Sequence, residues 1–245
     1  MNTKVLLLSA VCAAGIALGQ SCPANASIKS YEFAYTSFFG PKQLIINGST
    51  VLDAVSSGWY DSSGLHDSTN ANYIVGNCLP ATCDGGDGKT LYNDFFVFDL
   101  SGVKGPITSA VLSIANPSAA DNLDPPFPSD GFGGVPTTYS NWDVSTPIAT
   151  LIADATGATG IYADLGSGVR YGSRGVGPAT DGIQVNVALD AAALAALQSD
   201  EGGQFAIGGT LAAVPEPAAW AMLLLGFGGV GAMLRHRRRP APATA

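Results

Sequence analysis

Few side chains in this chain have the types and spacing that acid–base, nucleophilic or metal chemistry requires. His66 is the only histidine between residues 20 and 217, and no recognisable nucleophile motif accompanies it. One histidine is also too few for a zinc site of the usual cysteine and histidine spacing. Paired carboxylates could support glycoside hydrolysis, but all 19 acidic residues lie in this region, so chance pairs are expected. We therefore expect no catalytic residue, no metal site and no cofactor, and a protein that is not an enzyme.

Two short patterns match nucleotide-binding loops by their letters alone. Gly226-Phe227-Gly228-Gly229-Val230-Gly231 reads as GxGxxG, but it lies inside an apolar stretch and not between a strand and a soluble helix. Gly88-Lys89-Thr90 lacks the glycine that a phosphate-binding loop has five positions before Gly88, where Cys83 stands. Neither pattern predicts nucleotide binding.

Loop carboxylates and aromatic rings are the remaining candidates for ligand contacts. Two groups of aspartates could offer oxygens to calcium: Asp84 with Asp87, and Asp121 with Asp124 and Asp130. Neither group has EF-hand or glycine-rich repeat spacing, so solvated loop carboxylates are the favoured interpretation. Sugar rings stack on flat aromatic faces, and the candidates for glycan contact are Trp59, Tyr60, Tyr139 and Trp142. The alternative is that these four are ordinary core or edge residues.

The first 19 residues have the organisation of a secretory signal peptide. Lys4 precedes an apolar run from Val5 to Leu18, and Ala17-Leu18-Gly19 supplies small residues at positions minus three and minus one of a cleavage site. Cleavage after Gly19 leaves Gln20 at the mature N-terminus, and Ala24-Asn25-Ala26 is a second candidate site. The sequence therefore predicts export.

Three cysteines remain once Cys12 leaves with the signal peptide. An odd number in an oxidising compartment leaves one thiol over. We expect a local disulfide between Cys78 and Cys83, which enclose only four residues. Cys22 is then the unpaired cysteine, and its lipidation is an alternative.

The C-terminal residues have the physical properties of a membrane-sorting tail. The 17 residues from Ala218 to Leu234 carry no charge, and as a helix they span about 25 Å, the short end of what crosses a bilayer. Four arginines follow at once and hold their end in the cytoplasm: Arg235, Arg237, Arg238 and Arg239. The domain before Pro215 is therefore expected on the other side of the membrane. A simple anchor that is never cut is the alternative.

Pro215-Glu216-Pro217, the apolar segment and the arginine cluster, in this order, resemble the PEP-CTERM sorting signal of Gram-negative bacteria. The resemblance covers about the last 30 residues. It implies that an exosortase, a membrane-embedded cysteine protease, recognises Pro215, Glu216 and Pro217 and removes the tail. It also implies anchoring in the inner membrane before processing, and delivery to the cell surface or an extracellular polysaccharide matrix afterwards.

Composition predicts one exported β-domain. Residues 20–213 form the ectodomain, residues 214–239 the sorting signal and residues 240–245 a disordered tail. From Gln20 to Pro217, six Lys and Arg stand against 19 Asp and Glu, a net charge near −13 that argues against nucleic acid as a partner. Low charge content and many Gly, Ser, Thr, Asn and Ala residues favour short strands and turns.

The predicted strands and turns indicate a two-layer antiparallel β-sandwich, jelly-roll-like, with one short helix in addition to the signal helix and the transmembrane helix. Asn47-Gly48 predicts a hairpin turn, and residues 56–77 read as a long polar loop. Asp190 is expected to cap a helix over 191–197. We expect residues 95–100 to form a buried strand that pairs with 107–115, and further strands over 139–144, 148–151, 183–189 and 204–211.

Residues Phe96 to Val103, then Ile107 to Leu112, resemble the extracellular β-sandwich modules of the disaggregatase-related and carbohydrate-binding type. Gln204 to Gly209 resembles the close of many PEP-CTERM ectodomains. These positions imply a fold and not a ligand. The expected function is that of an exported, non-catalytic surface or matrix protein, with a carbohydrate-binding module and a polysaccharide-active hydrolase as alternatives.

Overall fold

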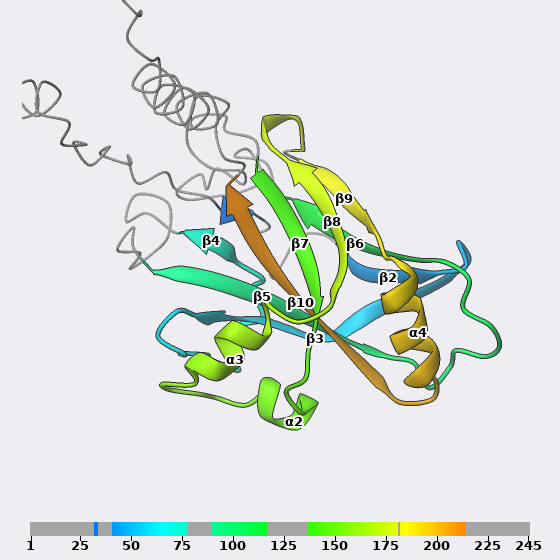
Figure 1. Ribbon diagram of the computed structural model, residues 1–245, viewed down its shortest axis with the longest axis horizontal. Coiled ribbons are helices and arrows are strands. Elements are labelled where there is room, and N and C mark those ends of the chain that lie inside the picture. Colours follow the sequence, from blue (N-terminus) through cyan, green and yellow to red (C-terminus); the bar gives the residue numbers. More distant parts are fainter. Residues whose placement is uncertain (1–31, 34–40, 78–89, 117–136, 181, 214–245) are drawn as a thin grey trace, which may run out of the picture.

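The computed structural model describes residues 32–33, 41–77, 90–116, 137–180 and 182–213 (Figure 1). These residues are mostly β-structure. The strands are β1 (Glu32–Phe33), β2 (Lys42–Ile46), β3 (Thr50–Asp61), β4 (Val75–Asn77), β5 (Leu91–Asp99), β6 (Ala110–Asn116), β7 (Thr137–Asp143), β8 (Arg170–Val176), β9 (Ile183–Ala188) and β10 (Gln204–Ala213). The short helices are α2 (Ile148–Leu151), α3 (Thr159–Asp164), the 3-10 helix η1 (Pro178–Thr180) and α4 (Ala191–Ser199).

The strands form one antiparallel sheet that is nearly closed into a barrel. Its order is β8-β7-β10-β5-β3-β2-β6-β9, and β4 with β1 is added beside β5. The two end strands approach each other: the Asp190 amide donates to the Tyr171 carbonyl at 2.8 Å, and a Cβ on Gly172 would lie 2.6 Å from the Ala188 carbonyl oxygen. The predicted antiparallel β-fold is confirmed. The strands follow one continuous path, however, in place of the two separate layers expected for a sandwich.

The predicted hairpin at Asn47-Gly48 is confirmed between β2 and β3. Asn47 and Gly48 have φ values of 51° and 69°, the positive angles that a two-residue turn requires. The Asn47 side chain also accepts hydrogen bonds from the amides of Thr108 and Ser109, at 2.8 and 3.1 Å. The turn residue therefore joins the hairpin to the start of β6.

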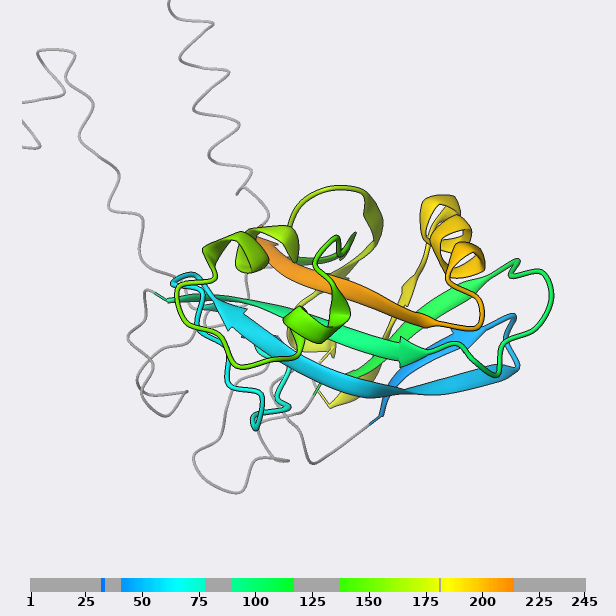
Figure 2. The ribbon, with the colours of Figure 1, turned by 90° about the horizontal axis from the view of Figure 1, so that it is seen from below.

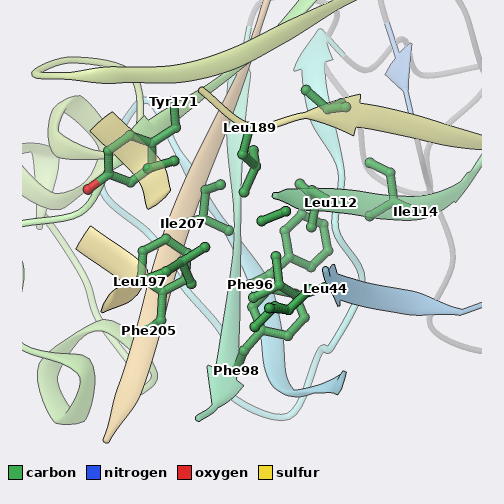
Figure 3. Packing of buried hydrophobic residues seen from close by; sticks show 14 of the residues in the cluster. Leu44, Phe96, Phe98, Leu112, Ile114, Tyr171, Leu189, Leu197, Phe205 and Ile207 are labelled. Carbon is green, nitrogen blue, oxygen red and sulfur yellow. The ribbon is translucent and has the colours of Figure 1, made fainter. Parts of the chain in front are cut away.

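Strand β5 is apolar without interruption because each of its faces covers a different core. Phe96 and Phe98 belong to the main core enclosed by the curved sheet (Figure 3). Phe95 and Val97 belong to a second cluster, which includes Leu151 of α2 and residues of α3. Figure 2 shows α2 and α3 outside the curved sheet. Side chains alternate along a strand, so burial of both faces produces the continuous run that the sequence shows.

Helix α4 confirms the predicted cap. The Asp190 carboxylate accepts hydrogen bonds from the amides of Ala192 and Ala193, at 2.9 and 3.1 Å. Ala193 and Leu197 face the main core, so the cap orients a helix whose buried side closes one end of the barrel.

Several predicted elements are corrected by the structure. Residues 56–61 are not loop but the second half of β3, where Ser57 and Tyr60 are buried against β5. Residues 148–151 form a helix and not a strand, since a four-residue apolar run does not by itself distinguish the two. Strand β6 pairs with β2 and β9, and not with β5 as expected from their closeness in sequence. Strand β8 was not predicted, because its glycines and arginines interrupt the alternation of apolar and polar residues that marks a strand.

Candidate functional site

Strand β10 lies in the middle of the sheet and changes partners along its length (Figure 1). Residues 204–209 pair with β5, and residues 207–213 pair with β7. Beyond Gly209, β7 is the only strand of the described residues that pairs with β10, because β4 occupies the edge of β5 at Leu91 and Tyr92. The last four residues of β10 are therefore held on one edge.

A buried polar cluster lies where β10 separates from β5. Gly209 stands opposite Asp94 of β5 and Asn141 of β7. The Tyr139 side chain crosses β10 at this glycine and donates a hydrogen bond to Asp94, with its oxygen 2.9 Å from Oδ1 and 3.2 Å from Oδ2. A Cβ on Gly209 would overlap both Asp94 Oδ1 and the Tyr139 hydroxyl, so only glycine leaves room for this contact.

Burial dominates the electrostatics of this cluster. Burial raises the pKa of Asp94 well above its ordinary value of 3.8, although the Tyr139 hydrogen bond opposes this shift. Burial also raises the pKa of Tyr139, and the nearby Asp94 raises it further. No cation of the described residues forms an ion pair with Asp94, so nothing there offsets the cost of a buried negative charge.

Two further polar atoms of β7 face the interior without a hydrogen-bond partner. They are Oγ1 of Thr137 and Oδ1 of Asn141, both in residues that are almost completely buried. The Asn141 amide nitrogen does have a partner, since it donates to the Gly208 carbonyl at 3.2 Å. Of these two residues, Asn141 belongs to the cluster at Gly209, and its side chain is only partly satisfied, which is uncommon in protein interiors.

The four candidate glycan-contact residues do not form one surface. Tyr60 and Tyr139 are both fully buried, so neither ring offers a face to a sugar. The Tyr60 hydroxyl donates to the Leu151 carbonyl at 2.9 Å and ties α2 to the sheet. Trp59 and Trp142 are half-buried. Trp59 makes an edge-to-face contact with Tyr92, whose ring centroid is 5.3 Å away.

Trp142 lies on the outer face of β7, and its indole Nε1 donates to Oγ1 of Thr210 at 3.0 Å. The contact crosses from β7 to β10 at the residue where one-edged pairing of β10 begins. Trp142 is therefore the half-buried candidate ring that contacts β10 at this change of partners.

His66 has a structural role in the second cluster. Its ring is buried, stacks on Tyr60 with centroids 4.7 Å apart, and donates from Nδ1 to the Trp59 carbonyl at 2.8 Å. Burial lowers the pKa of His66, with smaller opposing contributions from the Trp59 hydrogen bond and from Asp154. A buried, stacked imidazole of this kind packs the α2–α3 region against β3.

Several predicted sites fall outside the described residues: the cysteine pair Cys78 and Cys83, the five loop aspartates named above, the signal peptide, and the sorting signal with its apolar segment. Within the described ranges, no group of three or more His, Cys, Asp or Glu side chains is placed to hold a metal ion. No helix of the described part is long and apolar enough to cross a membrane.

Comparison with known protein families gives a match that begins where β10 ends. Residues 213–239 match the PEP-CTERM protein-sorting motif. The motif marks an exported protein that an exosortase recognises, which confirms the predicted sorting signal. The match covers the tail and not the barrel, and neither the curated proteins nor the solved structures give a match. The resemblance of the ectodomain to carbohydrate-binding modules therefore stays a prediction.

The sequence did not point to the Asp94 cluster. Asp94 comes two and four residues before Phe96 and Phe98, a spacing that places all three side chains on one face of a strand. That alternation was the available signal. A solvated aspartate at the start of a strand is far commoner, so composition argued against it.

Proposed function

We propose that this protein is a non-catalytic component of the cell surface or of an exopolysaccharide matrix, which an exosortase sorts through the C-terminal tail. The observation that carries the proposal is the sorting motif over 213–239, which begins at the last residue of β10. A signal peptide over 1–19 starts export in this scheme. The segment 218–234 then anchors the chain in the inner membrane, with the barrel in the periplasm, until processing releases it.

A non-catalytic role agrees with the burial of two groups of the described residues that could take part in acid–base chemistry. Asp94, whose raised pKa would suit a general acid, is completely buried behind Tyr139. His66 is buried, and its Nδ1 is occupied by a backbone carbonyl. Neither group is open to a polymeric substrate.

Intact-mass analysis of the protein from a host that contains an exosortase tests the sorting proposal. The native chain is expected to lose residues at both ends, and a variant with Pro215, Glu216 and Pro217 changed to alanine is expected to keep its C-terminal tail. Pro240→Ala with Pro242→Ala, beyond the arginines, is the matched control and should be processed normally. Equal processing of both variants, or a native chain that keeps its tail, would contradict the proposal. A covalently added sugar on the shortened product would support attachment to polysaccharide.

Carbohydrate binding is a second candidate function, and Trp142 is the residue that favours it. Its ring is half-buried on the outer face of the sheet, beside the hydroxyl of Thr210. An aromatic ring with a neighbouring hydroxyl suits a sugar ligand, because the sugar ring stacks on the aromatic face and its hydroxyl groups form hydrogen bonds with the polar neighbour. A glycan array with the processed protein should then show binding that Trp142→Ala abolishes and Trp59→Ala reduces less. Binding that survives both changes would exclude these rings.

A polysaccharide-active hydrolase is the third candidate. It requires two accessible carboxyl groups about 5–10 Å apart across a cleft. Release of reducing ends from matrix polysaccharide by the purified protein would favour it over the two binding roles.

A further inference from the structure

The end of β10 and the start of the sorting motif are almost contiguous. Ala213 is the last residue of β10 and pairs with Thr137, and only Val214 separates it from Pro215. The element that the exosortase recognises therefore begins two residues beyond the last backbone pair of β10.

A protease that recognises an extended element needs the chain free on both sides of that element. On the N-terminal side of the Pro-Glu-Pro element, the backbone belongs to β10, which lies in the middle of the sheet and pairs with its neighbours. Pairs join Thr210 to Ser140, Leu211 to Tyr139, Ala212 to Thr138 and Ala213 to Thr137. The backbone groups of these four residues pair with β7 and are not available to an enzyme until the pairs open.

The pairing of β10 is weakest at this same end. Residues 207–209 have ladders on both edges, whereas residues 210–213 pair only with β7 among the described strands. A segment held on one edge opens locally at lower free energy than one held on two. Thr210 marks the boundary, because its hydroxyl accepts the Trp142 hydrogen bond and its methyl group lies against Gly166.

We infer that residues 210–213 of β10 are part of the exosortase substrate, and that they leave β7 when the enzyme binds the Pro-Glu-Pro element. The inference rests on the proposed sorting function and adds to it the segment that opens. Sorting is then linked to the structure: the barrel stays closed up to Gly209, and Thr210 is the point at which the strand separates. The segment that the enzyme would bind is this four-residue strand end, which pairs with β7 alone among the described strands.

Two variants in the full-length chain test the inference by the rate of tail removal in an exosortase-containing host. Leu211→Gly weakens the one-edged segment, because glycine removes a side chain packed against the core and adds backbone freedom. We expect it to be processed several-fold faster than the native chain. Val111→Gly is the matched control, since Val111 is also half-buried but lies on β6, away from β10. It should leave the processing rate unchanged.

A third variant carries eight Gly and Ser residues inserted after Ala213. It gives the enzyme free chain without opening β10, so it should be processed faster than the native protein and should lose its sensitivity to Leu211→Gly. Equal rates for Leu211→Gly and Val111→Gly, or an insertion without effect, would overturn the inference while leaving the sorting function intact. A native chain that is never processed would overturn the sorting function itself.

Discussion

The hydroxyl of Tyr139 on β7 reaches across β10 to the carboxyl group of Asp94 on β5, at 2.9 Å from Oδ1. One side-chain contact in the barrel interior thus joins β7 to β5 across β10, which separates them in the sheet. The contact exists because the middle strand has a glycine at the crossing point.

Replacing that glycine should destabilise the fold. In Gly209→Ala the new methyl group overlaps the Tyr139 hydroxyl and Asp94, and overpacking of this kind costs about 1–3 kcal/mol. Urea unfolding followed by circular dichroism measures the change. Gly175→Ala on β8 is the control, because a Cβ there meets nothing within 4 Å, and its stability should be unchanged or slightly higher. If Gly209→Ala left the free energy of unfolding unchanged, the Tyr139 side chain could adopt another conformation without cost.

The stability of the protein should depend on pH through Asp94. The folded state holds the Asp94 proton more tightly than the unfolded chain, because burial raises its pKa. The stabilisation from this proton is therefore complete below the ordinary pKa of 3.8 and is lost as the pH rises through the higher pKa of the folded state. One such proton changes the free energy of unfolding by up to about 1.4 kcal/mol per pH unit.

Asp94→Asn removes this dependence and keeps an acceptor for Tyr139. We expect the unfolding free energy of the native protein to fall, relative to the variant, as the pH rises above the ordinary aspartate pKa of 3.8 and through the higher pKa of the folded state. In this range the exposed Asp67, Asp99 and Asp154, whose pKa values are lowered by hydrogen bonds, are ionised in both proteins. Parallel pH profiles for the two proteins would mean that Asp94 is ionised in the fold.

Loss of the Asp190 cap should weaken the contact between α4 and the core. Asp190→Ala leaves the first amides of the helix unpaired, and such changes cost about 0.5–2 kcal/mol. Thermal unfolding measures the effect. Asp200→Ala, at the other end of α4, removes a charge that the helix dipole disfavours and should not lower the melting temperature. A drop of equal size in both variants would point to charge and not to capping.

Tyr60 should control local opening of α2 and not only global stability. Tyr60→Phe removes the donor to the Leu151 carbonyl and leaves that buried group unpaired, a change that costs about 1–3 kcal/mol. Hydrogen exchange should become faster at Ile152 and Ala155, which lie next to this contact. Tyr73→Phe removes a similar bond, to the Ala115 carbonyl at 2.9 Å, but on the other side of the barrel. In the Tyr73→Phe variant, hydrogen exchange of the amides near α2 should be as slow as in the native protein.

Local signals in the sequence predicted local structure well. The Asn47-Gly48 turn, the Asp190 cap and the alternation of residues 183–188 each depend on neighbouring residues only, and each is present. Pairing between distant strands was less predictable. Strands β5 and β6 follow each other in the chain, but β5 has β3 and β10 as neighbours, which are recruited from before and after it.

The candidate site shows the same division. The tail was predictable because its charge, apolar length and prolines are contiguous in sequence. The Asp94 cluster was not, because it depends on three strands meeting at Gly209, and no single segment carries that information. The sequence could not show that Tyr60 and Tyr139 are buried, because the exposure of a ring depends on residues that pack over it from elsewhere in the chain.

The approach of β8 to β9 also bears on how densely such a protein can be displayed. Open sheet edges recruit strands from neighbouring molecules and begin aggregation. Here the two edges of the barrel face each other across a narrow seam, where Gly172 lies close to the Ala188 carbonyl and Arg174 reaches the Asn186 carbonyl. Within the described residues, β8 and β9 therefore offer little open edge to a strand of a neighbouring copy.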